Sequence, residues 1–197
     1  GQIIFNDVDI ADPHVDINVH RRHMGMVFQH FNLFNNKTVL ENIMLAPVHV
    51  RCKGLHGAKR KEEVKKIREQ AMGLLARINM QDKADVYPST LSGGQKQRLT
   101  IARALVKQPE ILIMDDSSSA LDYATDAKLR QAIHNMPNRP TVFIVSQRAA
   151  SIMYADKIIV LDDGTVAGTG THEELLKDCS VYQEIYYSQF KRTEGGH

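Results

Sequence analysis

The sequence predicts an α/β protein whose core is a largely parallel β-sheet. Helical and strand patterns alternate along the chain after Pro88, which is the order that parallel strands with crossover helices require. The strand patterns are short apolar runs, as expected for strands that are covered on both faces. A long amphipathic helix precedes them, so helices and strands are mixed in one chain.

The first 80 residues predict two strand regions and one long helix. Gly1–Ile10 alternates and turns like a strand pair, and Met24–Phe28 is a short apolar strand that ends at Gln29. We expect loop and a short helix in residues 30–50. From Ala58 to Met80, apolar residues recur at helical spacing, opposite a face of Lys, Arg and Glu. The mixed signs on that face favour a solvated surface over a polyanion site.

The second half of the chain predicts alternating helices and strands, in this order: Gly94–Lys107, Ile111–Met114, Tyr123–Met136, Thr141–Val145 and Lys157–Leu161. In parallel sheets, ligands bind beyond the carboxyl ends of the strands, which is where Asp115, Asp116 and Gln147 fall. We expect the tail, residues 193–197, to be disordered.

Composition narrows the class of protein. With 197 residues, and 25 Lys and Arg against 23 Asp and Glu, the chain is one globular unit without a broad field for nucleic acid. Cys52 and Cys179 are far apart and predict neither a disulfide framework nor a zinc site, so a reducing cytosol fits best. No apolar run approaches the ~20 residues that span a bilayer. No signal peptide is visible, and the first residue is Gly rather than Met, which is consistent with a fragment.

The sharpest motif is Leu91-Ser92-Gly93-Gly94-Gln95, which runs directly into a predicted helix. Glycines let a backbone approach a ligand closely, and the free N–H groups of a helix start attract phosphate. Ser92 can add a hydroxyl donor. Alternatively, Ser92 and Gln95 form an S-x-x-Q capping box, which stabilises any helix and needs no nucleotide.

This motif continues into Gln97-Arg98 and Ala102-Arg103-Ala104-Leu105, and a strand ending in Asp follows. The combination closely resembles the ABC ATPase family. The resemblance implies a P-loop NTPase-like parallel-sheet core with an inserted α-helical subdomain. We therefore expect a single, partial ABC ATPase domain over residues 1–197, with the helical subdomain near 39–91 and the nucleotide-binding core in 1–38 and 92–192. The family's signature, here Ser92, Gly93, Gly94 and Gln95, binds the ATP held by a partner.

The strand Ile111-Leu112-Ile113-Met114-Asp115 resembles a Walker B strand, so Asp115 is the candidate ligand of Mg²⁺. Most active members of the family have Glu next, where this chain has Asp116. The shorter side chain retains the carboxylate but not its reach, and we expect weakened catalysis. Asp116 could instead cap a helix.

Three further positions resemble motifs of the family. Gln29, within Gly25-Met26-Val27-Phe28-Gln29, matches the Q-loop glutamine, which contacts Mg²⁺ or water and ATP. Asp122 ends a segment like the D-loop, which meets the opposite subunit, although it could equally be a helix N-cap. Gln147 stands where the family has its switch His, and an amide cannot carry the imidazolium charge.

The GxxxxGK[ST] motif does not occur in these residues, nor does any Gly-Lys dipeptide. We therefore expect the core to lack the Walker A strand and loop, and ATP binding in cis to be severely weakened. The signature acts on the partner's nucleotide and would be unaffected.

The chain resembles two branches of the family. Up to about Leu105, segments such as Thr38-Val39-Leu40-Glu41-Asn42-Ile43 resemble ATPase subunits of polar amino-acid importers. From about Glu110, the sequence resembles the degenerate half of heterodimeric exporters. A natural recombinant, an assembly artefact or a designed chimera would each explain the mixture. The direction of transport stays open, with a slight preference for an exporter.

The resemblance implies an ATP-binding subunit that binds and hydrolyses ATP, with Mg²⁺, at a head-to-tail dimer interface to drive transport. Its partners would be a second ABC ATPase subunit, identical or different, and transmembrane domains that hold it at the cytoplasmic face of the membrane. Alternatively, it is a non-hydrolysing subunit that only lends its signature to a partner. A chromosome or repair ATPase would need long coiled-coil heptads, for which the stretch from Gln29 to Leu91 is too short. We therefore expect no nucleic-acid partner.

Overall fold

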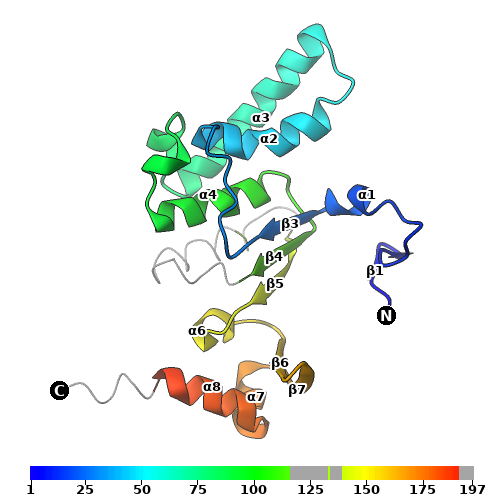
Figure 1. Cartoon of the computed structure of the whole chain (residues 1–197), viewed down its shortest axis with the longest axis vertical. Helices are drawn as coiled ribbons and strands as arrows, with labels where there is room; N and C mark the ends of the chain where they lie inside the picture. The colour runs from blue at the N-terminus through cyan, green and yellow to red at the C-terminus, as the bar shows by residue number, and fades with distance from the viewer. Residues whose placement is uncertain (116–132, 134–138, 191–197) are drawn as a thin grey trace, which may run out of the picture. The chain divides into compact units, whose positions relative to one another are not determined.

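The computed structural model describes residues 1–115, 133 and 139–190 (Figure 1). The chain divides into two compact units, residues 1–143 and 144–197, and each is described by itself. The predicted helix at 123–136 and the predicted disordered tail fall largely outside the described residues.

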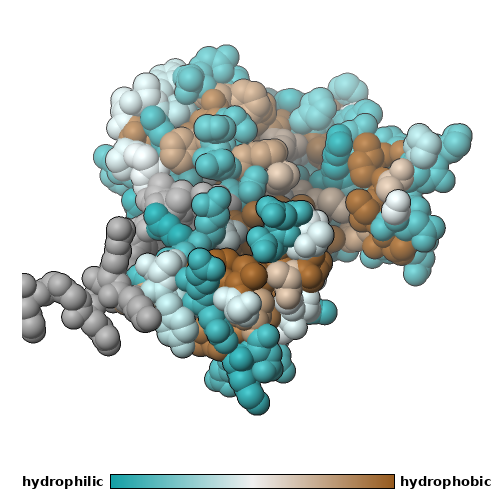
Figure 2. Space-filling view, turned by 60° about the horizontal axis from the view of Figure 1, so that its bottom comes forward, coloured by the Kyte–Doolittle hydropathy of each residue, from teal (hydrophilic) through white to brown (hydrophobic). Residues whose placement is uncertain are grey.

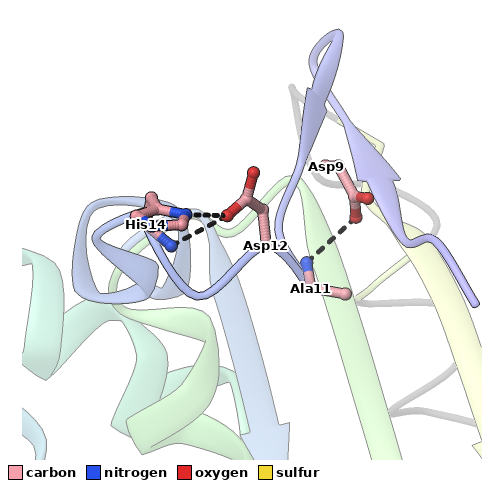
Figure 3. A network of polar contacts seen from close by, with 4 residues as sticks. All are labelled: Asp9, Ala11, Asp12 and His14. Carbon is pink, nitrogen blue, oxygen red and sulfur yellow. Dashed lines mark hydrogen bonds and ion pairs between the residues drawn. The ribbon is translucent and has the colours of Figure 1, made fainter.

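The chain begins with a small hairpin and a turn-rich segment. Strands β1 (Ile4–Phe5) and β2 (Val8–Asp9) pair antiparallel, as predicted for Gly1–Ile10. The next residues form side-chain turns, in which Asp9 accepts from the Ala11 N–H at 3.0 Å (Figure 3). Asp12 likewise accepts from the His14 N–H at 2.8 Å, and this bond, together with one to the His14 ring, lowers the pKa of the Asp12 carboxyl.

A three-stranded sheet confirms the predicted parallel core. Its order is β3 (Met24–Val27), β4 (Ile111–Asp115) and β5 (Thr141–Val145). β3 and β4 run parallel, with Met24 opposite Ile111 and Val27 opposite Met114. Gly25 lies where β3 approaches the chain that leads into β4, and a Cβ there would be 3.1 Å from the Ala104 carbonyl oxygen.

Two helices of the first unit pair in opposite directions and are joined by a short loop (Figure 1). α3 (Gly57–Arg77) confirms the predicted amphipathic helix, and the 3₁₀ turns η1 (Gln81–Lys83) and η2 (Pro88–Thr90) follow it. α2 (Val39–Arg51) is 13 residues long, so the short helix expected in residues 30–50 was an underestimate. Pro47 lies inside α2, and its helix-breaking tendency is offset by a capping box between Thr38 and Glu41 and by the buried apolar face of α2.

Helix α4 (Gly93–Leu105) packs between the helical layer and the sheet. Leu99 and Ala102 lie in a cluster with buried residues of α2 and α3. Ile101, Ala104 and Leu105 lie in a second cluster, with residues of β3 and β4. One helix therefore contributes to both hydrophobic cores of the first unit.

The second unit consists of a hairpin covered by helices, namely α6 (Ala149–Ile152), β6 (Ile158–Asp162), β7 (Thr165–Gly170), α7 (His172–Asp178) and α8 (Ser180–Phe190). β6 was predicted, whereas β7 and the helices were not assigned in advance. The Tyr182 side chain is 1% exposed at the centre of its core cluster. Large apolar side chains on β6 and β7 stay exposed, and Figure 2 shows such surface as brown patches between hydrophilic regions. None of the helices in the described part of the chain has the length and apolar character needed to cross a membrane.

Candidate functional site

The capping box predicted as the alternative for the signature motif is present at the start of α4. The Ser92 Oγ accepts from the Gln95 N–H at 3.3 Å, and the Gln95 Oε1 accepts from the Ser92 N–H at 2.9 Å. The side chains of Ser92 and Gln95 therefore satisfy two of the four N–H groups that a helix start leaves without backbone partners.

The capping box does not use the other two N–H groups, those of Gly93 and Gly94. Within the described residues, neither group donates to another protein atom. Ser92 and Gly93 are exposed, and no described atom lies within 4 Å of where a Cβ on Gly93 would be. Two adjacent free N–H groups at the positive end of a 13-residue helix are suited to bind an anion such as a phosphate. The helix-capping and phosphate-binding interpretations are thus compatible.

The segment after Gln29 is fixed by two polar residues that sequence reasoning did not single out. Arg103 on α4 donates from Nη1 to the Asn32 carbonyl at 2.6 Å and from Nη2 to the Phe31 carbonyl at 3.1 Å. Partial burial lowers the pKa of the Arg103 guanidinium. Arg103 therefore ties α4 to the segment that follows Gln29.

Asn42 on α2 holds the other end of the same segment. Its side chain is buried, accepts from the Phe34 N–H at 2.9 Å, and donates to the carbonyls of Phe34, Lys37 and Thr38 at 2.9–3.1 Å. A buried amide of this kind replaces the backbone partners that a loop lacks. Linear sequence gives no signal for the bonds of Arg103, which join residues 71 and 72 positions apart, whereas those of Asn42 span only four to eight positions.

Gln29 and Asp115 lie at the same edge of the sheet. Because Val27 is opposite Met114 on parallel strands, the chain positions that follow, including Gln29 and Asp115, come at the carboxyl ends of neighbouring strands. Gln29 is exposed and Asp115 is partly buried. In the described part of the chain, no hydrogen bond or ion pair joins Ser92 to either residue.

The remaining predicted site residues are Gln147, Asp116 and Asp122, and none of them is described beside Ser92, Gln29 or Asp115. Gln147 follows β5, has an exposed side chain, and its carbonyl accepts from Gln189 Nε2 at 2.8 Å within the second unit. Asp116 and Asp122 lie outside the described residues.

A basic pocket of about 250 Å³ lies among α1 (Ile17–Arg21), α2 and the end of α4. Its cations are Arg21, Arg22, Arg51 and Lys107, and its lining contains no carboxylate. Lys107 donates to the Met24 carbonyl at 2.9 Å, and burial lowers the pKa of its ammonium group.

These features define a nucleotide-binding α/β domain: a parallel sheet with an amide and a carboxylate at its carboxyl edge, and a glycine-containing helix start with free N–H groups. The family model described as ABC transporter matches residues 1–119. The chain belongs to the ABC transporter family, in which it is an ATP-binding domain of the ABC ATPase type.

Known proteins from both branches are similar to the chain. The glutamine transport ATP-binding protein GlnQ of Geobacillus stearothermophilus is 37% identical over 180 residues, which cover 90% of this chain and 71% of GlnQ. A solved bacterial Atm1-family ABC exporter with ATP bound superposes with a TM-score of 0.77 at 31% identity, covering 96% of this chain and 32% of the exporter. The ATP-binding cassette MJ0796, solved as a dimer with ADP and Pi, gives a TM-score of 0.74 at 32% identity, covering 87% of this chain and 73% of MJ0796. Relatives named as importer subunits and a structurally similar exporter agree with the predicted resemblance to both.

Proposed function

We propose that the first turn of α4 binds the terminal phosphate of an ATP molecule held by a second ABC ATPase subunit. The observation that carries this proposal is that no described protein atom accepts from the N–H groups of Gly93 and Gly94, which lie beside an exposed Ser92. Ser92 and Gln95 keep this turn helical, and no described atom lies within 4 Å of where a Cβ on Gly93 would be. The dimer is head-to-tail, and it is homo- or heteromeric.

The chain's own nucleotide would be bound at the sheet edge. Gln29 and Asp115 offer an amide oxygen and a carboxylate, the oxygen ligands that Mg²⁺ prefers, and Mg²⁺ normally keeps several waters and the substrate phosphates as its other ligands. Asp116 and Gln147 would act on the attacking water and the γ-phosphate, and Asp122 would meet the opposite subunit. Residues 39–91 would form the helical subdomain, and residues 1–38 and 92–192 the nucleotide-binding core.

Transmembrane partners would hold the chain at the cytoplasmic face of the membrane. The surface around Gln29 and residues 31–36, fixed by Arg103 and Asn42, would respond to nucleotide. The basic pocket that includes Arg21 and Lys107 would receive an acidic segment of such a partner.

The test uses an intact ABC ATPase subunit as the partner and measures its ATP hydrolysis in the mixed dimer. Ser92→Asp preserves an N-cap acceptor but places a negative charge beside the phosphate, so we expect at least a tenfold loss of stimulated hydrolysis. Ser92→Arg, which fills the open turn, should lose as much. The matched control is Thr171→Arg, which breaks a similar capping box in the second unit. If hydrolysis survives both Ser92 variants, or falls equally in the control, the assignment is wrong.

A second candidate is a subunit that donates its signature while hydrolysing little ATP itself. The shorter carboxylate of Asp116 and the neutral amide of Gln147 favour it. Robust Mg²⁺-dependent ATP hydrolysis by the purified chain would exclude it. We expect Asp116→Glu together with Gln147→His to raise hydrolysis only in a chain that also has a GxxxxGK[ST] loop.

A further inference from the structure

The far end of the α2–α3 pair carries a local excess of positive charge. Residues 49–70 contain eight Lys and Arg against three Glu, although the whole chain has a net charge of only +2. The rest of the chain is therefore slightly acidic. Such a concentration of charge attracts anionic surfaces over about one Debye length.

Most of these cations are not neutralised by neighbours. Two ion pairs occur among the described residues of this segment, Arg51 with Glu63 and Lys66 with Glu62. Lys61, Lys65 and Arg68 recur at i, i+4 and i+7 on one side of α3, and all three are exposed. The opposite-sign pairs therefore do not cancel this basic stripe.

An apolar pocket lies beside the same charges, between α2 and the start of α3. It has a volume of about 480 Å³, and its lining includes the side chains of Leu45, Val48 and Cys52. Two cations, Lys53 and Arg60, and the imidazole of His49 border this apolar surface, and all three side chains are exposed. An apolar floor with a cationic rim matches an amphiphilic anion, whose phosphate contacts the rim while its hydrocarbon covers the floor.

We propose that this end of the α2–α3 pair, residues 45–68, binds anionic phospholipids at a membrane surface. Long lysine side chains in a diffuse stripe suit a fluid layer of headgroups better than the fixed carboxylates of a protein segment, which would need matching donors at defined positions. The inference rests on the proposed function only in that a transmembrane partner brings the chain to a membrane.

The experiment measures co-sedimentation of the full chain with vesicles, without nucleotide or partner. We expect binding to phosphatidylcholine vesicles that contain phosphatidylglycerol, little binding to pure phosphatidylcholine, and loss of binding at high salt. The variant with Lys53→Gln and Arg60→Gln should lower the partition coefficient by about fivefold for each cation removed. Leu45→Gln, which adds no charge, should lower it by about tenfold if hydrocarbon enters the pocket.

The matched control is a variant with Lys157→Gln and Lys177→Gln, which removes the same charge from exposed positions in the second unit and should bind like the wild type. Equal binding to both kinds of vesicle, or an equal loss in the control, would overturn the proposal. So would a wild type that ignores vesicles but binds immobilised polyglutamate or RNA through Lys53 and Arg60. Because this assay contains no ATP and no second subunit, its failure leaves the Ser92 experiment unaffected, and the reverse also holds.

Discussion

Arg103 gives the most direct test of how the signature helix is connected to the segment after Gln29. Its guanidinium donates to two consecutive carbonyls, of Phe31 and Asn32, at 3.1 and 2.6 Å. A hydrogen bond from a charged donor contributes about 1.5–3 kcal/mol, and partial exposure reduces that value. Replacing Arg103 by Ala should therefore destabilise the closed form of this segment by about 2 kcal/mol.

Amide hydrogen exchange reports this local opening. The Phe34 N–H is bonded to the Asn42 side chain at 2.9 Å, so it exchanges only when the segment opens. An opening that is easier by about 2 kcal/mol accelerates its exchange roughly thirtyfold under conditions where closing is fast. Arg103→Lys, which keeps the charge but not the fork of donors, should restore less than half of the lost protection.

The control is Arg98→Ala, since Arg98 lies on the same helix but donates to the Ile78 carbonyl at 3.3 Å, at the end of α3. It should leave exchange at Phe34 unchanged. The reasoning is refuted if Arg103→Ala leaves Phe34 protected, or if Arg98→Ala accelerates its exchange as strongly.

Three other predictions follow from single contacts. Gly25→Ala should lower the free energy of unfolding by about 1–2 kcal/mol, because a Cβ would meet three atoms at 3.1, 3.1 and 3.2 Å. Gly73→Ala, in open space on α3, should instead raise the free energy of unfolding by about 0.5–1 kcal/mol, because alanine favours a helix more than glycine does. Asn42→Ala should lower it by about 3 kcal/mol in urea unfolding, because buried backbone groups lose their partners. Hydrogen bonds from Thr171 lower the pKa of the Glu174 carboxyl. The contribution of the Glu174 carboxylate to capping α7 is therefore present above the ordinary pKa of 4.5, and it is lost as the pH falls through the lower pKa of the folded state. The NMR shift of the Thr171 amide should follow this titration, and Glu174→Gln should abolish it.

Each of these predictions has a result that contradicts it. Equal effects of alanine at positions 25 and 73 would show that β3 relaxes freely. An Asn42→Ala variant as stable as the wild type would mean that water replaces the amide. A Thr171 amide that titrates at the ordinary glutamate pKa, or that still titrates in Glu174→Gln, would mean that the carboxylate is not held in the capping box.

The sequence predicted the elements that have a clear apolar pattern. Helix α3 and strands β3, β4 and β5 are found close to their predicted positions, since helical spacing marks α3 and short apolar runs mark the strands. The expected cover on both faces does not hold for β5, whose residues are exposed or only partly buried. Residues 30–50 were expected to form loop and a short helix, so the length of α2 was missed. The Thr38-x-x-Glu41 box followed by Val39, Leu40 and Ile43 was the signal that could have identified the longer helix.

The candidate site was predictable where it is local and not where it is assembled by folding. Ser92, Gly93, Gly94 and Gln95 are consecutive, so their cap and their free N–H groups follow from the motif itself. Arg103 contacts residues 71 and 72 positions away, and no periodic pattern encodes a bond across such a separation. The pairing of β3 with β4 brings Gln29 and Asp115 to one edge, which the strand order could only suggest.

Because α4 contributes side chains to both hydrophobic clusters of the first unit, it cannot shift at its first turn without disturbing two packed surfaces at once. A ligand that binds the Gly93 and Gly94 amides would therefore act on a helix that is packed against both the α2–α3 pair and the sheet. The exposed chain around Asn32 is hydrogen-bonded to Arg103 near the other end of this helix. The first turn of α4 and this surface segment are therefore connected through one helix that is packed on two sides.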